Sequence, residues 1–414
     1  MRADSSSHSG YQLRLLAILA LINFVNFADR NFVYPLFPLL RQHFSVTNAQ
    51  LGLLELYLQG VLALATIPSG LLADRLSRTR IIAVGIVFWS LATFLGGLAP
   101  TFQSLLLARA LVGVGEASYA PAAQSMISGA FPAVSRARAQ AVYAAGMLVG
   151  GTAGLALGGV IGQALGWRAP FFLVGIPGLI LGLTALRLQE PPRGPRTELV
   201  PVWRLLGVPA YLALIASGVL ITFASYSFIT WGPDFVVRYK GFSPAEAGVL
   251  LGTTGLLALV LGVLAGGYLA DLAQKRWIYG RVVTVALAFL AAAPFILWAL
   301  YAEDKRLVLA AFFLAAFFMS WYHGPVTAVI HDMMPRRAHA TSVALYMFVT
   351  QLVGAFGPRQ VGKISDLRDL RAGLEVAVGV MVLGALGFFL VCYLIRRHGL
   401  RHPLLEPYRA EPGD

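Results

Sequence analysis

Two full charges lie inside an otherwise apolar stretch that runs from about residue 103 to residue 131. Arg109 and Glu116 are seven residues apart, which on an α-helix is two turns, about 20° out of register and about 10 Å along the axis. They therefore share one face, and Gly113 flattens the surface between them. A charge in hydrocarbon costs at least about 2.5–3.5 kcal/mol, so such residues face a bundle interior or a wet cavity. The pair predicts that this helix forms the wall of a cavity.

A carboxyl group in such a cavity can carry a proton, because desolvation disfavours its charged form while a nearby arginine favours it. Glu116 is the first candidate, and a permanent ion pair that ties two helices together is the alternative. Asp29 is the second candidate, and simply holding Arg30 or an asparagine is its alternative. Arg30 and Arg109 stay charged at any relevant pH, so each can bind a phosphate or carboxylate or serve as the partner of an acid.

The first apolar stretch, residues 12–40, contains Asn23, Asn26, Asp29 and Arg30. Neighbouring residues are about 100° apart on a helix, so Asp29 and Arg30 cannot neutralise each other across one face. Each needs another partner or water. Counting from the ends of the stretches places both at a depth similar to that of Arg109, which predicts a cluster of four charges.

Composition places these stretches in a bilayer. Of the 414 residues, 58% are hydrophobic and only 12% are charged, whereas soluble domains carry about 25% charged residues. About twelve runs reach the roughly 20 apolar residues of a helical span. The net charge of +13 reflects orientation, not nucleic-acid binding, because arginines and lysines gather in alternate loops. We expect both termini in the cytoplasm, a retained first span and a bacterial inner membrane.

The second half of the chain repeats the first. Gly267 to Asp271 has the spacing of Gly70 to Asp74, and basic residues follow both. Two six-helix halves around an aqueous site are typical of alternating-access transporters. We therefore predict an all-α membrane protein of two pseudo-symmetric bundles, residues 1–188 and 209–397. A cytoplasmic linker at 189–208, with an interfacial helix at 198–206, joins them, and 398–414 form a tail.

Two groups of residues are expected to shape the motion. Four glycines at four-residue spacing, Gly146 to Gly158, let a neighbouring helix approach closely. At the cytoplasmic mouth, an aspartate can meet the positive N-terminus of a facing helix and stabilise one conformer, with solvated loop charge as the alternative. The predicted gating residues are Asp74, Arg75, Arg78 and Asp271.

The two halves differ in content, since the core of the second half carries no comparable charge and offers aromatic and polar side chains instead. This contrast suggests an amphipathic substrate with an acidic headgroup. Glu55 either faces the cavity beside Gln59 or is hydrated near the outer surface. The phenylalanine-rich run of the tenth apolar stretch is more often core or lipid contact than a specific substrate site. The predicted substrate-binding residues are Arg30, Arg109, Asn26, Glu55, Tyr119, Tyr226, Trp231, Phe317, Trp321 and Gln351.

These motifs resemble the major facilitator superfamily over nearly the whole chain. Three segments match its motifs in order and spacing: the loop from Gly70 to Arg80, the run from Arg109 to Gly115, and the glycines from Gly146 to Gly158. Within the superfamily the chain resembles the Spinster group. The matching segments are Asp29-Arg30, Arg109 to Pro121, Glu190 to Gly194 and Gly357 to Asp366. One departure is Leu272, where an arginine is expected after Asp271.

The resemblance implies secondary transport of lysophospholipids or sphingoid phosphates coupled to protons, with Asp29, Arg30, Arg109 and Glu116 at the coupling and binding centre. Protons are the only cofactor expected, no metal is expected, and the partners are membrane lipids and the substrate. We expect a monomer and no enzyme activity. The alternatives are a drug or organic-anion exporter or facilitator without lipid preference, and a lipid-binding receptor that transports nothing.

Overall fold

A computed structural model describes residues 3–191, 201–400 and Leu405, and every regular element in these ranges is a helix. The side chains of residues 3–9, 71, 73–75, 133, 134, 137 and 323 lie outside this description. Ten helical segments of the described chain are long and apolar enough to cross a membrane, and the shorter Ala169–Ala185 is also apolar. Residues 102–130 form the remaining span from two short helices. The predicted all-helical fold with about twelve spans is confirmed.

The chain forms two compact units. Unit 1 contains Met1–Pro195 together with Pro233–Gly252, and unit 2 contains Arg196–Gly232 and Thr253–Asp414. The bundle boundaries predicted at residues 188 and 209 remain a prediction, and each unit is described here by itself.

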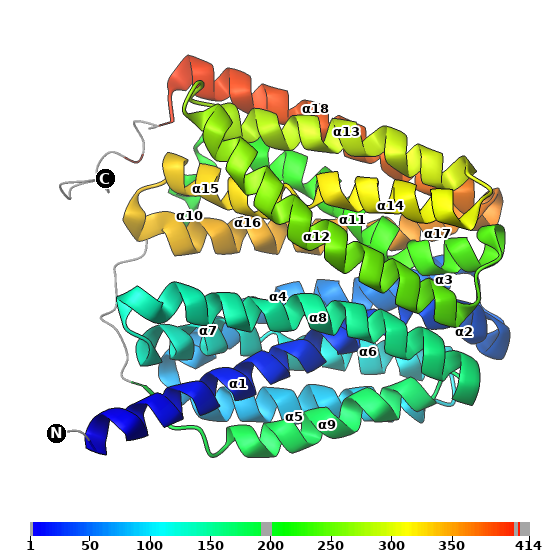
Figure 1. The fold of residues 1–414 in the computed structure, drawn as a ribbon, viewed down its shortest axis with the longest axis horizontal. Coiled ribbons are helices and arrows are strands. Elements are labelled where there is room, and N and C mark those ends of the chain that lie inside the picture. The colour runs from blue at the N-terminus through cyan, green and yellow to red at the C-terminus, as the bar shows by residue number, and fades with distance from the viewer. Residues whose placement is uncertain (1–2, 192–200, 401–404, 406–414) are drawn as a thin grey trace. The chain divides into compact units, whose positions relative to one another are not determined.

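Unit 1 is built from the first ten elements of the chain (Figure 1). These are α1 (Ala3–Asn31), η1 (Tyr34–Leu36), α2 (Phe37–Phe44), α3 (Asn48–Leu51), α4 (Leu53–Arg75), α5 (Arg78–Gly97), α6 (Phe102–Glu116), α7 (Tyr119–Ala130), α8 (Ala133–Leu165) and α9 (Ala169–Ala185). The end of α11 and the start of α12 complete it. Its core gathers around buried side chains such as Trp89, Val112 and Met126.

Unit 2 holds the remaining elements around a core that includes Phe289, Met381 and Phe388. They are α10 (Val202–Leu206), α11 (Pro209–Lys240), α12 (Pro244–Gln274), α13 (Gly280–Tyr301), α14 (Lys305–Met319), α15 (His323–Met333), η2 (Arg336–Ala338), α16 (His339–Gly354), α17 (Gly357–Leu367) and α18 (Leu370–His398). The helix predicted at 198–206 begins at Val202 in the described part of the chain, and residues 198–200 lie outside it.

The stretch around Arg109 and Glu116 is not one continuous helix. α6 ends at Glu116 and α7 begins at Tyr119. Pro121 supplies the physical reason, because a proline has no backbone N–H and its ring clashes with the carbonyl four residues earlier. Glu116 consequently occupies the last helical position before the break.

Glycines set the distance between α1 and α8. A Cβ atom added at Gly150 would lie 2.2 Å from the carbonyl oxygen of Phe24, and one at Gly154 would lie 2.4 Å from that of Ala28. Gly146 meets α1 in the same way, and Gly158 meets Phe32, which directly follows α1. The close approach predicted from the glycine spacing is confirmed, and it fixes the part of α1 that carries Asp29 and Arg30.

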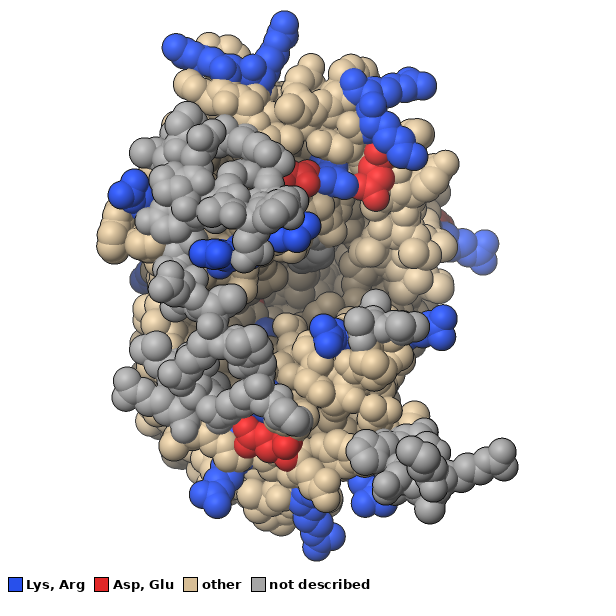
Figure 2. Space-filling view, turned by 90° about the vertical axis from the view of Figure 1, so that its left-hand side faces the viewer, with Lys and Arg blue, Asp and Glu red and all other residues tan. Residues whose placement is uncertain are grey.

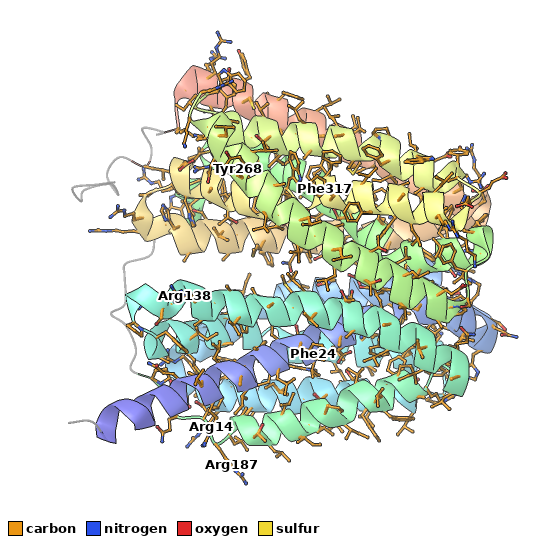
Figure 3. The ribbon with its side chains drawn as sticks, in the orientation of Figure 1. Arg14, Phe24, Arg138, Arg187, Tyr268 and Phe317 are labelled. Atoms are coloured by element: carbon orange, nitrogen blue, oxygen red, sulfur yellow. The ribbon has the colours of Figure 1, made fainter. Side chains whose placement is uncertain are left out.

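Basic side chains gather at one end of each unit, which we call the basic end. In unit 1 it is the end at which α1 begins, and Arg14, Arg138 and Arg187 lie toward it, whereas Phe24 lies midway along α1 (Figure 3). In unit 2 it carries the exposed pairs Lys275-Arg276 and Arg396-Arg397. Figure 2 views these ends and shows many Lys and Arg but few Asp and Glu.

Candidate functional site

The predicted four charges meet inside unit 1, where α1 crosses α6. Nε of Arg30 donates to Oε2 of Glu116 at 2.7 Å. Nη1 of Arg109 donates to Oδ1 of Asp29 at 3.2 Å and also to the Asp29 carbonyl oxygen. Adjacent residues of α1 thus take different partners, as the 100° between them requires. The site is two antiparallel ion pairs, one acid and one base from each helix.

The two acids have different surroundings. Asp29 is 1% exposed, and its second oxygen, Oδ2, accepts a hydrogen bond from the hydroxyl of Thr93 on α5. Glu116 has a fully buried side chain, and its second oxygen, Oε1, has no hydrogen-bond partner. An unsatisfied buried acceptor costs about 1–3 kcal/mol. The cluster therefore contains one fully bonded carboxylate and one with a vacant acceptor.

The two bases differ in the same way. The Arg109 side chain is 2% exposed and reaches backbone carbonyls of α1 as well as Asp29. The Arg30 side chain is 19% exposed, and its guanidinium lies 4.8 Å from the centre of the Phe27 ring. Arg109 is therefore enclosed by protein, and Arg30 is the base that a solute can reach.

Other polar residues predicted for the site, on α1 and α4, are also buried. Glu55 is 2% exposed and accepts a 2.6 Å hydrogen bond from the hydroxyl of Tyr34. This placement decides between the two expectations for Glu55, because it is buried and not hydrated at the surface. Nδ2 of Asn26 and Oε1 of Gln59 are buried without a hydrogen-bond partner.

Tyr119 stands apart from the cluster of four charges. Its ring is 1% exposed and packs edge-on against Trp89, and its hydroxyl donates to the carbonyl oxygen of Leu19 at 2.5 Å. That hydroxyl fastens α7 to α1.

The predicted residues of the second half lie in unit 2. Trp231 is fully buried, and its indole N–H donates to the Pro358 carbonyl oxygen at 2.8 Å. Phe317 and Trp321 are half-buried and form one aromatic group with Phe318, with ring centres 5.2–5.7 Å apart. Phe317 is labelled in Figure 3. Tyr226 and Gln351 are half-buried on α11 and α16.

Among the predicted gating residues, Arg78 has a well-defined setting. Its Nε donates to Glu190 at 3.0 Å, its Nη1 donates to Ser125 at 2.8 Å, and its Nη2 donates to the Pro191 carbonyl oxygen. Partial burial raises the pKa of Glu190, but hydrogen bonds from Ser77 and Arg78 outweigh this effect and lower that pKa to about 2. Arg78 therefore anchors the start of the linker to α5 and α7.

In unit 2 the corresponding place is taken by Arg281, which bridges Asp271 at 2.8 Å and Asp332 at 2.5 Å. Asp271 thus links the end of α12 to α13. The side chains of Asp74 and Arg75 lie outside the described residues.

A buried charge in the second half was not anticipated. Asp234 on α11 is fully buried and accepts a bidentate pair of hydrogen bonds from Arg41, at 2.7 and 3.2 Å. Arg238 lies 3.4 Å away on the next turn. The expectation that the core of the second half carries no comparable charge is wrong, and this segment belongs to unit 1. The rule that singled out Arg109 applies equally to Asp234 and would have found it.

Thr93 and Tyr34 were also missed, because a hydroxyl in an apolar helix is common and its sequence neighbours do not reveal its partner. Among the described side chains, no group of three or more His, Cys, Asp or Glu is placed to hold a metal ion.

Comparison with known proteins gives a consistent assignment. The profile of the Major Facilitator Superfamily matches residues 19–358. The chain is 30% identical over 417 residues to an MFS-type efflux pump of Mycolicibacterium smegmatis, covering 95% of this chain and 94% of the relative. It is 29% identical over 432 residues to protein spinster homolog 1 of Xenopus laevis, covering 92% and 80%.

A solved structure agrees over the same length. The crystal structure of a bacterial homolog to the human lysosomal transporter Spinster, in an inward-facing and unoccupied conformation, matches with a TM-score of 0.83 and 25% identity. The match covers 94% of this chain and 98% of that one. The chain therefore belongs to the Major Facilitator Superfamily of membrane transporters, and within it the predicted resemblance to Spinster proteins is confirmed.

Proposed function

We propose that this protein is a proton-coupled secondary transporter of an amphipathic anion, such as a lysophospholipid or a sphingoid phosphate. One observation carries the proposal: Glu116 is buried with a vacant Oε1, and its Oε2 accepts from the partly exposed Arg30. A proton and an anionic headgroup therefore act on the two members of one ion pair.

The chemistry follows from charge balance. A proton on Oε1 neutralises Glu116 and weakens its hold on Arg30, because an ion pair becomes a hydrogen bond to a neutral acceptor. Arg30 can then exchange this contact for a bidentate one with a phosphate or carboxylate. When the anion leaves, Arg30 needs a counter-charge again, and Glu116 supplies it by releasing its proton. Each event favours the other, which is the linkage that coupled transport requires.

Arg109 has a supporting role in this mechanism. It is enclosed by Asp29 and by carbonyl oxygens of α1, so it holds the cluster together while Arg30 meets the substrate. The aromatic group around Phe317 and Trp321 supplies apolar surface suited to a hydrocarbon tail. A two-state rocking of the halves would expose the site to each side in turn.

The test is movement of a labelled lysophospholipid into proteoliposomes driven by a pH gradient. We expect gradient-driven movement in the wild type, none above empty liposomes in Glu116→Gln, and full movement in Glu303→Gln, which alters an exposed carboxyl. Unchanged gradient dependence in Glu116→Gln would reject the proton role. Binding without movement in the wild type would instead favour a receptor.

A second candidate function rests on the relative described as an MFS-type efflux pump, which is 30% identical over nearly the full length. Under it, the same Arg30–Glu116 pair would export organic anions or drugs without preference for lipids. Competition separates the two candidates. A short-chain organic phosphate that blocks lysophospholipid movement at equal concentration would favour the exporter, and competition only by molecules with a long tail favours the lipid transporter.

We also propose that the basic ends face the cytoplasm of a bacterium and that the protein lies in the inner membrane. Exposed arginines in the first half of α1, at the start of α8 and in the last turn of α18 support this orientation. A reporter that is active only in the cytoplasm, fused to the C-terminus, should be active, and a periplasm-specific reporter at the same position should be silent.

A further inference from the structure

The hydroxyl of Thr93 distinguishes the two acids of the cluster, because it donates a hydrogen bond to Asp29. We propose that Thr93 holds Asp29 as the permanent carboxylate partner of Arg109, so that Glu116 is the acid that exchanges the proton. This inference rests on the proposed function and deepens it, because it identifies the residue that keeps Asp29 ionised and so leaves the proton to Glu116. Thr93 is a positioning residue in this scheme and does not touch the substrate.

The first observation is the complete coordination of Asp29. Its Oδ1 accepts from Arg109 and its Oδ2 accepts from the Thr93 hydroxyl. A hydroxyl has one proton to donate, and in Thr93 it goes to the carboxylate. Hydrogen bonds to the charged form of an acid favour that form. Both oxygens thus accept from a donor, and a proton on Asp29 would weaken both bonds because the negative charge that strengthens them is lost.

The second observation is the incomplete coordination of Glu116. It has one ion-pair partner, Arg30, and its buried Oε1 has no donor. A proton at Oε1 displaces nothing. The two acids lie on opposite sides of the same cluster, and only the hydroxyl of Thr93 distinguishes their second oxygens.

The third observation is the way α5 is held. A Cβ atom at Gly175 of α9 would lie 3.0 Å from the Ser90 carbonyl oxygen and 3.1 Å from the backbone nitrogen of Phe94. α9 therefore packs directly on the backbone around Thr93. Thr93 itself is 1% exposed, and its β-branched side chain has few rotamers. Its hydroxyl cannot easily withdraw from Asp29.

Other charges around Asp29 are few and identifiable. Arg30 lies in the last turn of α1, α6 provides Arg109 and Glu116, and α4 provides Glu55. Helix α8 carries no charged residue beyond Arg138, and α9 carries none. A change at Thr93 therefore acts on Asp29 without altering any charge in its surroundings.

The experiment is infrared titration of buried carboxyl groups in the purified full-length protein, which needs no substrate. The protonated carboxyl C=O band is followed against pH in the wild type, Thr93→Val, Thr93→Ser and Ser90→Ala. Ser90 is the matched control, since it is buried on the same helix and its hydroxyl has no hydrogen-bond partner. Asp29→Asn and Glu116→Gln assign the bands.

We expect one cluster band in the wild type, removed by Glu116→Gln and retained in Asp29→Asn. Thr93→Val should add a second band, removed by Asp29→Asn, with the titration of Asp29 moved up by about one to two pH units, the equivalent of one lost hydrogen bond to a charged group. Thr93→Ser and Ser90→Ala should match the wild type. If Thr93→Val does not fold, Thr93→Ala removes the same donor.

Two results would overturn the inference. One is a wild-type band that disappears in Asp29→Asn, and the other is a Thr93→Val titration identical to that of the wild type. Failure of the proposed function looks different, because it appears as absent pH-driven transport in the wild type whatever the infrared bands show.

Discussion

At the scale of single residues, the two ion pairs of the charge cluster differ in burial and in hydrogen bonding. Arg109 is enclosed and bonded to Asp29 and the backbone, whereas Arg30 is 19% exposed and bonded to one oxygen of Glu116. A pair of identical, fully bonded ion pairs would be a structural lock. The open oxygen on Glu116 and the reachable Arg30 leave one pair free to change partner.

This difference predicts unequal costs of neutralising the two arginines. Arg109→Gln leaves Asp29 buried without its cation, and removing one member of a buried pair typically costs about 3–5 kcal/mol. Arg30→Gln should cost less, because under the proposed mechanism Glu116 can take up a proton on its vacant Oε1 when its cation is lost. Thermal unfolding in detergent should show the larger drop in midpoint for Arg109→Gln. Equal drops would mean that both pairs are structural.

At this scale the sequence was sufficient to predict the intramembrane charges and the different directions of Asp29 and Arg30 on their helix. It was not sufficient to predict the uncharged partners of these residues on other helices. Thr93 comes from a helix with no special pattern, and nothing in one sequence states which hydroxyl faces which carboxylate. Asp234 was overlooked although it obeys the same physical rule as Arg109.

At the scale of helices, the contact between α1 and α8 determines where the charges sit. Three glycines of α8 lie against carbonyl oxygens of α1, and a fourth lies against that of Phe32 directly after it, at matching four-residue intervals. Small residues replace the hydrophobic effect as the means of packing helices in lipid. The regular spacing made this contact predictable, since it depends only on helical geometry.

Gly154→Ala tests the role of this contact. The added methyl group would lie 2.4 Å from the Ala28 carbonyl oxygen, so α1 and α8 must separate next to Asp29. Overpacking of this kind costs about 1–3 kcal/mol. Gly60→Ala on α4 is the control, because its nearest neighbour would be 3.7 Å away. The thermal midpoint should fall for Gly154→Ala and stay within error for Gly60→Ala.

The breaks in the helices were harder to foresee. Thr47 caps α3 and forms a capping box with Gln50. The interruption between α6 and α7 has its signal in Pro121, yet prolines at residues 68, 177, 233 and 294 lie inside unbroken helices. In a membrane, neighbouring helices can satisfy the freed backbone groups, so a proline alone does not decide between a kink and a break.

At the scale of the whole molecule, the motifs and the repeat were sufficient for the family, because several of them agree in order and spacing. The substrate is a different matter. It depends on the shape of a site built from many helices, and the aromatic residues of the second half fit a core as well as a tail-binding surface. The sequence therefore predicts the class of transporter, whereas the substrate is a proposal.

The segment that connects the two halves of the sequence has a pH dependence of its own. Because the pKa of Glu190 is lowered from 4.5 to about 2, its ion pair with Arg78 stabilises the folded state above about pH 4.5. That contribution is lost as pH falls through the range from 4.5 to 2. Glu190→Gln should therefore lower the unfolding midpoint at pH 7, with a difference that shrinks steadily below pH 4.5.

The comparison of wild type and Glu190→Gln at pH 7 and pH 3 provides the check. A difference that is the same at both values would mean that the carboxylate charge contributes nothing, and that the hydrogen bonds of Arg78 to Ser125 and Pro191 hold the segment alone.

The crossed order of the two ion pairs has a consequence for inheritance. Along α1 the acid precedes the base, and along α6 the base precedes the acid. A single mutation at Asp29, Arg30 or Arg109 leaves a buried charge without its partner, and an exchange of Asp29 with Arg30 on α1 alone sets like charges against each other. In related chains, loss of any of these three residues should therefore be accompanied by a change of its partner, so that each ion pair is inherited as a unit.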